Sequence, residues 1–353
     1  MKQNDVINLY TDNKEILGEY MNGNHRTILY ADGTKVKEIG YYINEMNTDG
    51  KRVNRWVDVD TGVMTYDFPE SFDIKITDKC NAGCKYCHEG SSINGKNGDL
   101  RSIEPVIRSL HPGTEISIGG GNIFEHPDLT WFLKLVKNQG AVASITVNQK
   151  HLRQYKNELL NLVAEKLVYG IGISLVDSSN KEDMELIDML GNNVVIHVIA
   201  GIFNKEDIPF IRNRKLLILG YKDLRRGHDL LTKDAETINK NIEWLKEVLP
   251  FLVFETKTIS FDCLGIKQIN PRDIIGVSDE EWNMLYQGSD YFVSDGNGNI
   301  TCATMYIDVP NMQIGRSSTA PLHLRPAFTG REDIRELFKL SIKGWPTNGL
   351  PII

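Results

Sequence analysis

Short apolar runs alternate with helical stretches from Phe72 onward, and this alternation constrains the fold more than any other feature of the sequence. The pattern repeats at intervals of roughly 25 residues, which is typical of βα units around a parallel sheet. Strands are expected at residues 72–77, 114–118, 143–147, 168–175, 193–199 and 215–219, and a further run at 256–261 is expected at the sheet edge. The sequence therefore predicts an α/β fold with six βα units.

Both ends of the chain depart from this pattern. Residues 1–71 carry the turn dipeptides Asp32-Gly33, Asp49-Gly50 and Thr61-Gly62 between short β-prone runs such as 26–30, as β-hairpins do. Beyond residue 278, we expect a short helix to Tyr286, a hairpin turn at 295–299 and a helix near 332–340. The predicted domains are a β-rich extension at 1–71, the βα domain at 72–265 and a β-containing C-terminal extension at 266–353.

Two of the helices between strands have signals of their own. One is expected to begin at Pro127 and end before Gly140, because Pro favours the first turn of a helix and Gly the position after its end. The other carries an apolar stripe and is expected to end before Pro250; the stripe is formed by Ile238, Ile242, Leu245 and Leu249.

Composition and charge disfavour several classes of function. The chain has 353 residues, of which 41% are hydrophobic, and it contains no run of eighteen apolar residues, so no membrane span is expected. Its first residues lack the charged-then-apolar order of a signal peptide, and the predicted location is therefore cytoplasmic. The net charge of −7 gives no electrostatic reason to expect a nucleic-acid partner.

Three of the five cysteines lie close together in the sequence. Cys80, Cys84 and Cys87 fall within eight positions, directly after the first strand of the βα domain, with gaps of three and two residues. Such clustering in a cysteine-poor chain indicates metal or redox chemistry rather than a disulfide framework. Three thiolates on a short loop can each bind one iron of a 4Fe-4S cluster and leave the fourth iron open.

Two other interpretations fit the same residues, and a third fits them poorly. Cys84-Lys-Tyr-Cys87-His88 matches a haem-attachment pattern, although covalent haem normally requires export and would leave Cys80 unused. Cys80, Cys84, Cys87 and His88 are also the ligand types of a zinc site, although adjacent residues rarely both face one tetrahedral ion. Buried free cysteines fit the polar loop poorly.

The motif Cys80-x3-Cys84-x2-Cys87, with aromatic Tyr86 before the last cysteine, resembles the defining motif of the radical S-adenosylmethionine superfamily. The similarity covers about residues 72–262. The resemblance implies a partial (β/α)6 barrel with small β-rich N-terminal and C-terminal extensions. It also implies an oxygen-sensitive enzyme with two cofactors, a 4Fe-4S cluster on these cysteines and S-adenosyl-L-methionine. In this family, reductive cleavage of S-adenosylmethionine gives a 5′-deoxyadenosyl radical that abstracts hydrogen from substrate, with electrons from a reductant such as flavodoxin or ferredoxin.

Further residues match the family's cofactor-binding positions. Gly119, Gly120 and Gly121 resemble the glycine-rich element that meets the methionine amino group, although the family usually has an acidic residue in place of Gly121. The resemblance also assigns cofactor contacts to residues at other strand ends and in the cysteine motif, namely Asn148, Ser174, Leu219 and Tyr86. A simple turn at the glycines, and turn or cap roles for Asn148 and Ser174, are the alternatives.

The remaining signals concern the substrate. A basic run brackets the sixth strand and fits either a solvated face or an anionic ligand; it comprises Arg212, Arg214, Lys215, Lys222, Arg225 and Arg226. Cys263 is a candidate hydrogen-atom donor, and Cys302 has no assigned role, while free core cysteines are the alternative for both. Modification of a peptide or protein, presented at an exposed strand edge, is the first prediction for the substrate. A nucleoside, nucleotide or small metabolite held inside the barrel is the second, and a non-enzymatic zinc-binding interaction protein is the alternative from another class.

Overall fold

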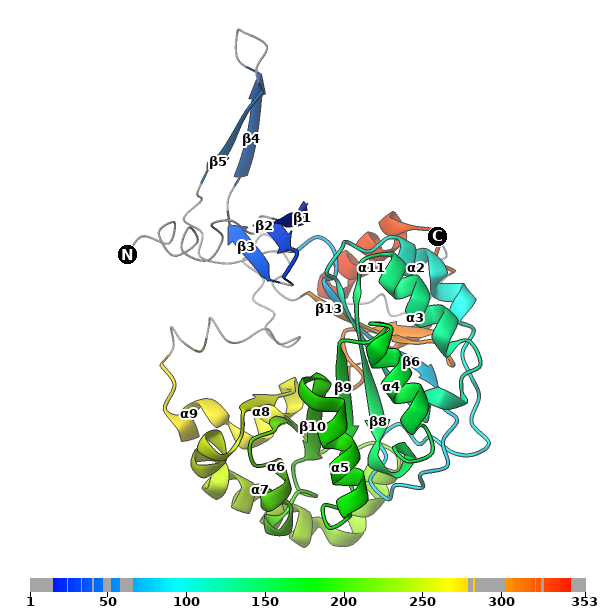
Figure 1. The fold of residues 1–353 in the computed structure, drawn as a ribbon, viewed down its shortest axis with the longest axis vertical. Helices are drawn as coiled ribbons and strands as arrows, with labels where there is room; N and C mark the ends of the chain where they lie inside the picture. The colour runs from blue at the N-terminus through cyan, green and yellow to red at the C-terminus, as the bar shows by residue number, and fades with distance from the viewer. Residues whose placement is uncertain are drawn as a thin grey trace.

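The structure is a computed structural model that describes residues 15–23, 25–32, 34–39, 41–46, 52–57, 66–278, 282, 303–320, 322–324 and 327–343. Its strands are β1 (Ile16–Asn22), β2 (His25–Tyr30), β3 (Lys35–Ile39), β4 (Tyr41–Met46), β5 (Arg52–Val57), β6 (Ser71–Thr77), β7 (Glu115–Gly120), β8 (Val142–Asn148), β9 (Gly170–Ser174), β10 (Val194–Ile199), β11 (Lys215–Leu219), β12 (Thr258–Phe261), β13 (Thr304–Asp308), β14 (Gln313–Gly315) and β15 (His323–Leu324). Ten of them form one sheet in the order β12-β11-β10-β9-β8-β7-β6-β13-β14-β15. Figure 1 shows part of this sheet, with β6, β8, β9, β10 and β13 labelled.

The parallel strands follow one another across this sheet in chain order, from β6 to β12. Strand β11 has the predicted bounds, and the ends of the other six differ from the predicted ones by at most two residues. The predicted edge strand is present as β12, which pairs with β11 in parallel. Because β12 does not pair with β6, the sheet stays open, and the predicted partial barrel is confirmed.

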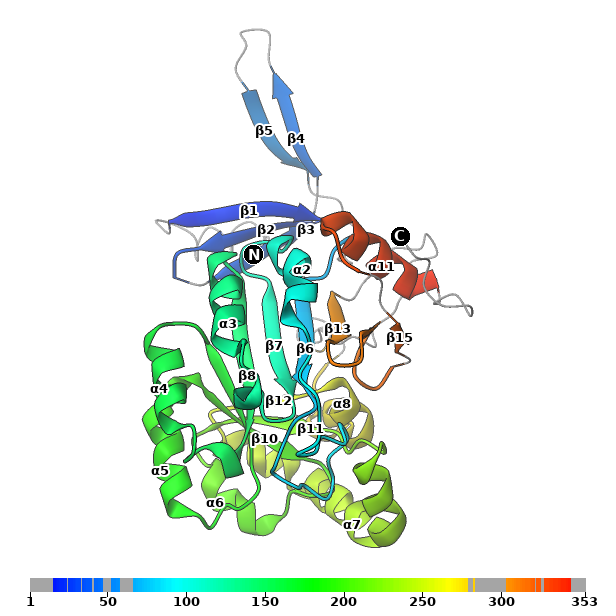
Figure 2. The ribbon, with the colours of Figure 1, turned by 90° about the vertical axis from the view of Figure 1, so that its right-hand side faces the viewer.

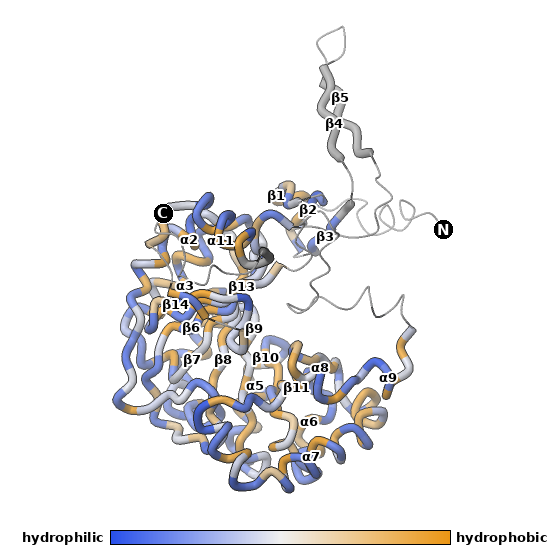
Figure 3. Tube along the Cα trace, turned by 180° about the vertical axis from the view of Figure 1, so that it is seen from behind, coloured by the Kyte–Doolittle hydropathy of each residue, from blue (hydrophilic) through white to orange (hydrophobic). Residues whose placement is uncertain are grey.

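Helices cover the outer face of this curved sheet (Figures 1 and 3). They are α2 (Glu104–Arg108), α3 (Leu129–Asn138), α4 (Lys156–Ala164), α5 (Lys181–Leu190), α6 (Ile208–Ile211), α7 (Arg226–Glu255), α8 (Cys263–Ile269), α9 (Pro271–Ile275) and, near the C-terminus, α11 (Arg331–Lys343). Short 3-10 turns are η1 (Leu100–Ile103), η2 (Ile123–Glu125), η3 (Gln149–His151), η4 (Gly191–Asn193) and η5 (Lys205–Asp207).

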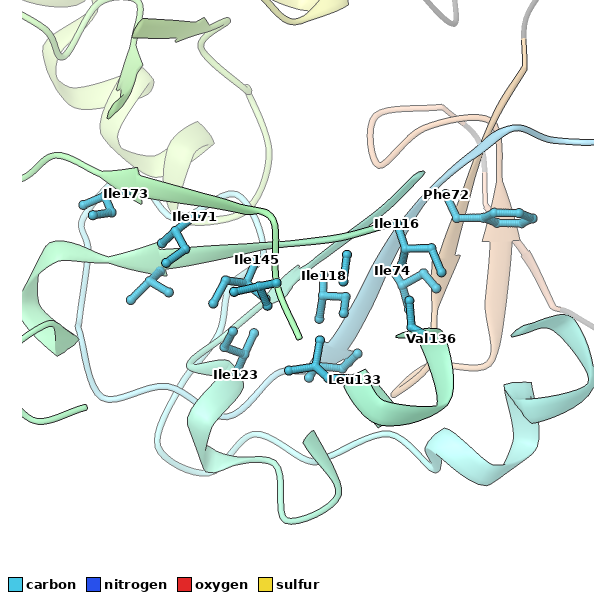
Figure 4. Packing of buried hydrophobic residues seen from close by; sticks show 14 of the residues in the cluster. Phe72, Ile74, Ile116, Ile118, Ile123, Leu133, Val136, Ile145, Ile171 and Ile173 are labelled. Carbon is cyan, nitrogen blue, oxygen red and sulfur yellow. The ribbon is translucent and has the colours of Figure 1, made fainter. Parts of the chain in front are cut away.

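The core lies between the sheet and this helix layer. Figure 4 shows Ile74, Ile118 and Ile145 of three neighbouring strands packed toward Leu133 and Val136 of α3. These side chains are almost fully buried. Strand residues alternate in burial along β8, so every second side chain points away from the helices, toward what we call the inner face of the sheet.

Helix α7 differs from its prediction. It continues through Pro250 to Glu255 instead of ending before the proline. Pro removes one helical hydrogen bond, but Leu249 and Leu252 on either side of it are fully buried in the core, and this packing holds the last turns in place. The helix expected at 127–140 is present as α3, and the terminal helix is present as α11.

The C-terminal segment joins the barrel sheet. Strand β13 pairs in parallel with β6, with Thr304 opposite Ser71 and Asp308 opposite Lys75. Strands β14 and β15 then extend the sheet in antiparallel fashion. The hairpin expected at 295–299, most of the short helix expected before Tyr286, and Cys302 lie outside the described residues, as do the turns at Gly33, Asp49-Gly50 and Thr61-Gly62.

The sheet β1-β2-β3 is attached at the amino ends of the barrel strands, opposite the loop that carries the cysteines (Figure 2). Asn22 fixes this contact through both ends of its amide: Nδ2 donates to Phe68 O at 2.8 Å, and Oδ1 accepts from Phe68 N at 3.0 Å. Glu70, only 4% exposed, accepts from His25 Nε2 at 3.2 Å and forms an ion pair with Lys37.

The Glu70 contact predicts acid sensitivity. Burial alone would raise the pKa of Glu70, but His25 and Lys37 together lower it from 4.5 to about 2. Because the pKa of Glu70 is lower in the folded protein, its ionised carboxylate stabilises the fold at any pH above the unfolded value of 4.5. This contribution is lost as the pH falls from 4.5 through about 2. We expect Glu70→Gln to cost on the order of 3 kcal/mol at pH 7 and to flatten the acid limb of the stability curve, measured by urea unfolding between pH 2 and 7. An acid limb that is equally steep in the variant would contradict this assignment.

Candidate active site

The three cysteines lie in residues 78–99, here called the cysteine loop, which follows the carboxyl end of β6. Backbone hydrogen bonds close this loop on itself: Cys80 N donates to Ser92 O at 2.8 Å, and Ser92 N donates to Asp78 O at 3.0 Å. Gly95 permits the close approach, since a Cβ there would lie 2.1 Å from Asp78 O. The loop therefore has a fixed base and presents its cysteines at the carboxyl edge of a parallel sheet, where α/β folds place their sites.

All three thiols are free and half-buried. Burial raises the pKa of Cys80 and of Cys84, and the charges of neighbouring loop thiolates raise it further. The thiols of Cys84 and Cys87 thus lie close enough to act on the thiol of Cys80. Metal ions displace such protons on binding, so three adjacent soft donors on one loop fit the three protein ligands of a 4Fe-4S cluster.

Asn148, the last residue of β8, points at this group. Its Nδ2 donates to Cys84 Sγ at 3.3 Å, while its Oδ1 accepts from Lys150 N at 3.0 Å and caps η3. Lys150 adds a second contact, because its Nζ donates to Ala82 O at 2.8 Å. Both side chains lower the pKa of Cys84, against the larger effect of burial. Asn148 thus has the cap role that the sequence allowed and also contacts a candidate ligand.

The glycines after β7 pack against the stem of the cysteine loop. Gly121 N donates to Thr77 O at 2.7 Å, and a Cβ on Gly121 would lie 2.3 Å from Lys79 O. Gly120 has φ +116°, and a Cβ there would lie 2.5 Å from Thr77 O. Close packing is therefore a sufficient reason for glycine at positions 120 and 121. Gly119 faces more open space, with only Thr146 Cβ within 4 Å of an added Cβ.

The other predicted cofactor residues lie at the same edge. Asn148 stands opposite Ser174, and Ser174 stands opposite His197, on three adjacent strands. Leu219 ends β11 opposite Ile199. Burial raises the pKa of Tyr86 to about 12, with Cys84 and Cys87 adding to the effect. The structure thus brings Tyr86 and Asn148 to the cysteines, while no contact between Leu219 and a thiol is present among the described side chains.

The inner face of the sheet is polar and lined by small residues. Ser144 and Thr146 of β8 lie on it, beside Gly170 and Gly172 of β9. The His197 ring lies over Gly172, where an added Cβ would be 2.1 Å from the ring. Burial lowers the pKa of His197 to about 4, so the imidazole is neutral at pH 7. His197 lies in the apolar run of β10, yet its ring faces the inner side of the sheet and has no hydrogen-bond partner in the described part of the chain.

Two charged residues of β6 on or near this face, Asp73 and Lys75, were not singled out by the sequence analysis. Asp73 lies on the inner face, and its side chain is exposed there. The loss of hydration inside the curved sheet raises its pKa, opposed by Lys222 and by a hydrogen bond from Ser117. Lys75, 2% exposed, forms ion pairs with three carboxylates: Asp78 at 2.6 Å, Glu89 at 2.8 Å and Asp308 at 3.2 Å. The alternation of Asp73 and Lys75 with buried apolar residues in β6 was the available signal for a polar inner face.

His88 does not join the cysteines. Its Nε2 lies 3.1 Å from Glu89 Oε1 and 3.3 Å from Lys222 Nζ, so the zinc set of three thiolates and His88 is not formed. Across the residues with described positions, no three His, Cys, Asp or Glu side chains surround a position for a single metal ion.

The basic run around β11 divides into two groups. Arg212 pairs with Glu255, and Arg214 forms a two-pronged contact with Asp188 at 2.7 and 2.8 Å. Lys215 donates to Asn192 O. These three therefore brace the amino ends of the strands, whereas Lys222, Arg225 and Arg226 contact the cysteine loop. Cys263 begins α8 after β12 and is half-buried; its role as hydrogen-atom donor stays a prediction.

Comparison with known proteins adds a separate line of evidence. No family model matches the chain. It is 24% identical over 254 residues to the antilisterial bacteriocin subtilosin biosynthesis protein AlbA of Bacillus subtilis strain 168, covering 62% of this chain and 56% of AlbA. It is 29% identical over 128 residues to a probable GTP 3′,8-cyclase of Methanococcus maripaludis strain C5, covering 35% of this chain and 41% of the cyclase. The chain thus spans about half the length of the curated relatives it matches.

A solved structure supports the fold. Streptococcus suis SuiB bound to precursor peptide SuiA superposes with a TM-score of 0.50 and 13% identity over 79% of this chain and 65% of SuiB. The relatives, this fold and the cysteine spacing all point to one superfamily. This superfamily is the radical S-adenosylmethionine superfamily of enzymes. The resemblance implies S-adenosylmethionine and an iron-sulfur cluster as cofactors. No helix in the described ranges has the length and apolar character needed to cross a membrane.

Proposed function

We propose that this protein is a radical S-adenosylmethionine enzyme and that it modifies a peptide or protein by hydrogen-atom abstraction. Cys80, Cys84 and Cys87 would hold the 4Fe-4S cluster, each thiolate on a different iron. When bound, the cluster supplies the electron that cleaves S-adenosylmethionine to the 5′-deoxyadenosyl radical. The observation that carries the proposal is the group of three half-buried thiols at the carboxyl edge of the sheet, with Asn148 donating to Cys84.

We further propose that S-adenosylmethionine binds beside this group on the inner face. Gly119, Gly120 and Gly121 would meet the methionine part through their backbone, and Asn148 and Ser174 would contact the ribose or the carboxylate. Leu219 and Tyr86 would contact the adenine side. The adjacency of Asn148 and Ser174 in register, at the same edge as the thiols, supports this placement. Gly119 favours it too, because its missing side chain leaves space on the inner face.

A peptide or protein is the substrate class that the comparisons favour. The names of two similar proteins refer to bacteriocin biosynthesis and to a bound precursor peptide. The small side chains and the neutral His197 on the inner face fit an uncharged group such as a backbone amide. A nucleotide substrate is the second candidate, favoured by the similarity to a probable GTP 3′,8-cyclase and by Lys222 near the inner face.

The remaining partners follow from the same proposal. A flavodoxin or ferredoxin would supply the electron in the cytoplasm, the proposed location. Cys263 would donate a hydrogen atom to a substrate radical in reactions that need one; its position at the carboxyl end of β12 supports this role.

The reaction is tested without knowing the substrate. The protein is reconstituted with iron and sulfide under anaerobic conditions and incubated with dithionite and S-adenosylmethionine. We expect about four irons per chain and slow release of 5′-deoxyadenosine, detected by mass spectrometry. A single tightly bound zinc and no 5′-deoxyadenosine would refute the proposal. Adding candidate peptides or nucleotides then separates the two substrate classes, because the true substrate accelerates 5′-deoxyadenosine formation and acquires a mass change.

A further inference from the structure

Residues 220–227, here called the turn after β11, run from the end of β11 into the first residues of α7 and bind the backbone of the cysteine loop. The Arg226 guanidinium donates from Nε to Cys84 O at 3.0 Å and from Nη2 to Ser91 O at 2.9 Å. One planar guanidinium group thus binds two backbone carbonyls of the cysteine loop, one at Cys84 and one at Ser91. The two bonds span the segment that contains Cys84 and Cys87.

Arg225 makes a second pair of contacts. Its Nη1 donates to Glu89 O at 2.7 Å and to His88 O at 3.1 Å. The side chain lies so close to Gly90 that an added Cβ there would be 2.8 Å from Arg225 Cδ. Arg225 has φ +50° and ψ −123°, a backbone conformation that costs energy for any residue except glycine. The surrounding contacts therefore hold it in a strained conformation.

The turn is itself anchored to α8. Gly220 N donates to Asp262 Oδ1 at 2.8 Å, and Tyr221 N donates to Gln268 Oε1 at 2.7 Å. Tyr221 Oη donates to Gly227 O at 2.7 Å across the turn. The turn after β11 therefore links the cysteine loop, which follows β6, to α8 beside the edge strand β12.

We propose that Arg226 is a positioning residue for the cluster: its fork sets the shape of the cysteine loop, and its charge favours the reduced form. This inference rests on the proposed function. A cluster held by three thiolates gains negative charge on reduction, and nearby positive charge and hydrogen bonds set its potential. Arginine suits both tasks because its rigid fork binds two acceptors and stays charged, whereas lysine keeps the charge but loses the two-pronged geometry.

The test compares Arg226→Gln and Arg226→Lys with Arg214→Gln. Arg214 is the matched control because it is also a two-pronged arginine but braces the amino ends of the strands. Hydrogen–deuterium exchange of the cluster-free protein measures how well the amides of the cysteine loop are protected. Exchange of the amides in β8 and β9 shows whether the fold is intact. We expect loop amides at 80–92 to exchange about five- to ten-fold faster in both Arg226 variants and unchanged in the control.

A redox titration of the reconstituted proteins, followed by electron paramagnetic resonance, separates charge from geometry. We expect iron affinity to fall about ten-fold in both Arg226 variants, and the midpoint potential to fall in Arg226→Gln but to stay near wild type in Arg226→Lys. A wild-type exchange rate and potential in Arg226→Gln would overturn the inference. An equal fall in potential in both variants would overturn its charge component. Wild-type protein that binds no cluster would instead refute the proposed function, while the exchange experiment would still decide the role of Arg226 in shaping the loop.

Discussion

Cys84→Ala is expected to abolish both cluster binding and 5′-deoxyadenosine formation. Cys84 is the middle ligand of the proposed set, the acceptor of the Asn148 amide and the residue whose carbonyl Arg226 holds. Its loss leaves only the thiolates of Cys80 and Cys87, and a cluster with three protein ligands needs one more. Iron analysis after anaerobic reconstitution and mass spectrometry of the products measure the two effects.

Lys85→Ala serves as the matched control for this experiment. Lys85 is the next residue of the same loop and is exposed, so its truncation removes a charged side chain without removing a sulfur. We expect this variant to keep wild-type iron content and wild-type formation of 5′-deoxyadenosine. Wild-type iron and product in Cys84→Ala, or equal losses in both variants, would contradict the proposed ligand role of Cys84.

Lys75→Met is expected to destabilise the folded protein by about 3–5 kcal/mol, because removing one partner from a buried ion pair leaves uncompensated charge. Here the uncompensated groups are the carboxylates of Asp78 and Glu89 from the cysteine loop and Asp308 from β13. The Lys75 ammonium thus forms ion pairs with both β13 and the cysteine loop. Urea unfolding at pH 7 measures the loss.

Lys79→Met provides the comparison for this effect. Lys79 is 43% exposed and pairs with Glu125 at 3.4 Å, and exposed pairs contribute at most about 1 kcal/mol. We expect the double variant Lys75→Met/Asp308→Asn to recover part of the stability, since it removes one of the unpaired charges. A loss in Lys75→Met no larger than in Lys79→Met would rule out the central role of this lysine.

The barrel was predictable because its signal is local. Alternation of apolar and polar residues places Ile145 toward the helices and Thr146 on the inner face, whatever the rest of the chain does. The spacing of Cys80, Cys84 and Cys87 after β6 is also local, and it was enough to indicate the family. Pro250 misled the prediction because tertiary packing of Leu249 and Leu252 outweighs the cost of one lost helical hydrogen bond.

The contacts that shape the site are long-range and could not be predicted. Pairing of β13 with β6 joins residues more than two hundred positions apart, such as Asp308 and Lys75, and no periodicity records such a pairing. The basic run was visible, but its residue types did not show that Arg214 braces strand ends while Arg226 holds the cysteine loop. Those roles depend on where the turn after β11 meets the loop after β6.

The most direct test of the account is the electron paramagnetic resonance spectrum of the dithionite-reduced protein before and after addition of S-adenosylmethionine. An iron without a protein ligand binds the added molecule, so we predict a reduced 4Fe-4S signal whose g values shift on addition. A spectrum that S-adenosylmethionine leaves unchanged, or the absence of any cluster signal in protein whose three thiols are intact, would contradict the claim that Cys80, Cys84 and Cys87 hold a cluster with one open iron.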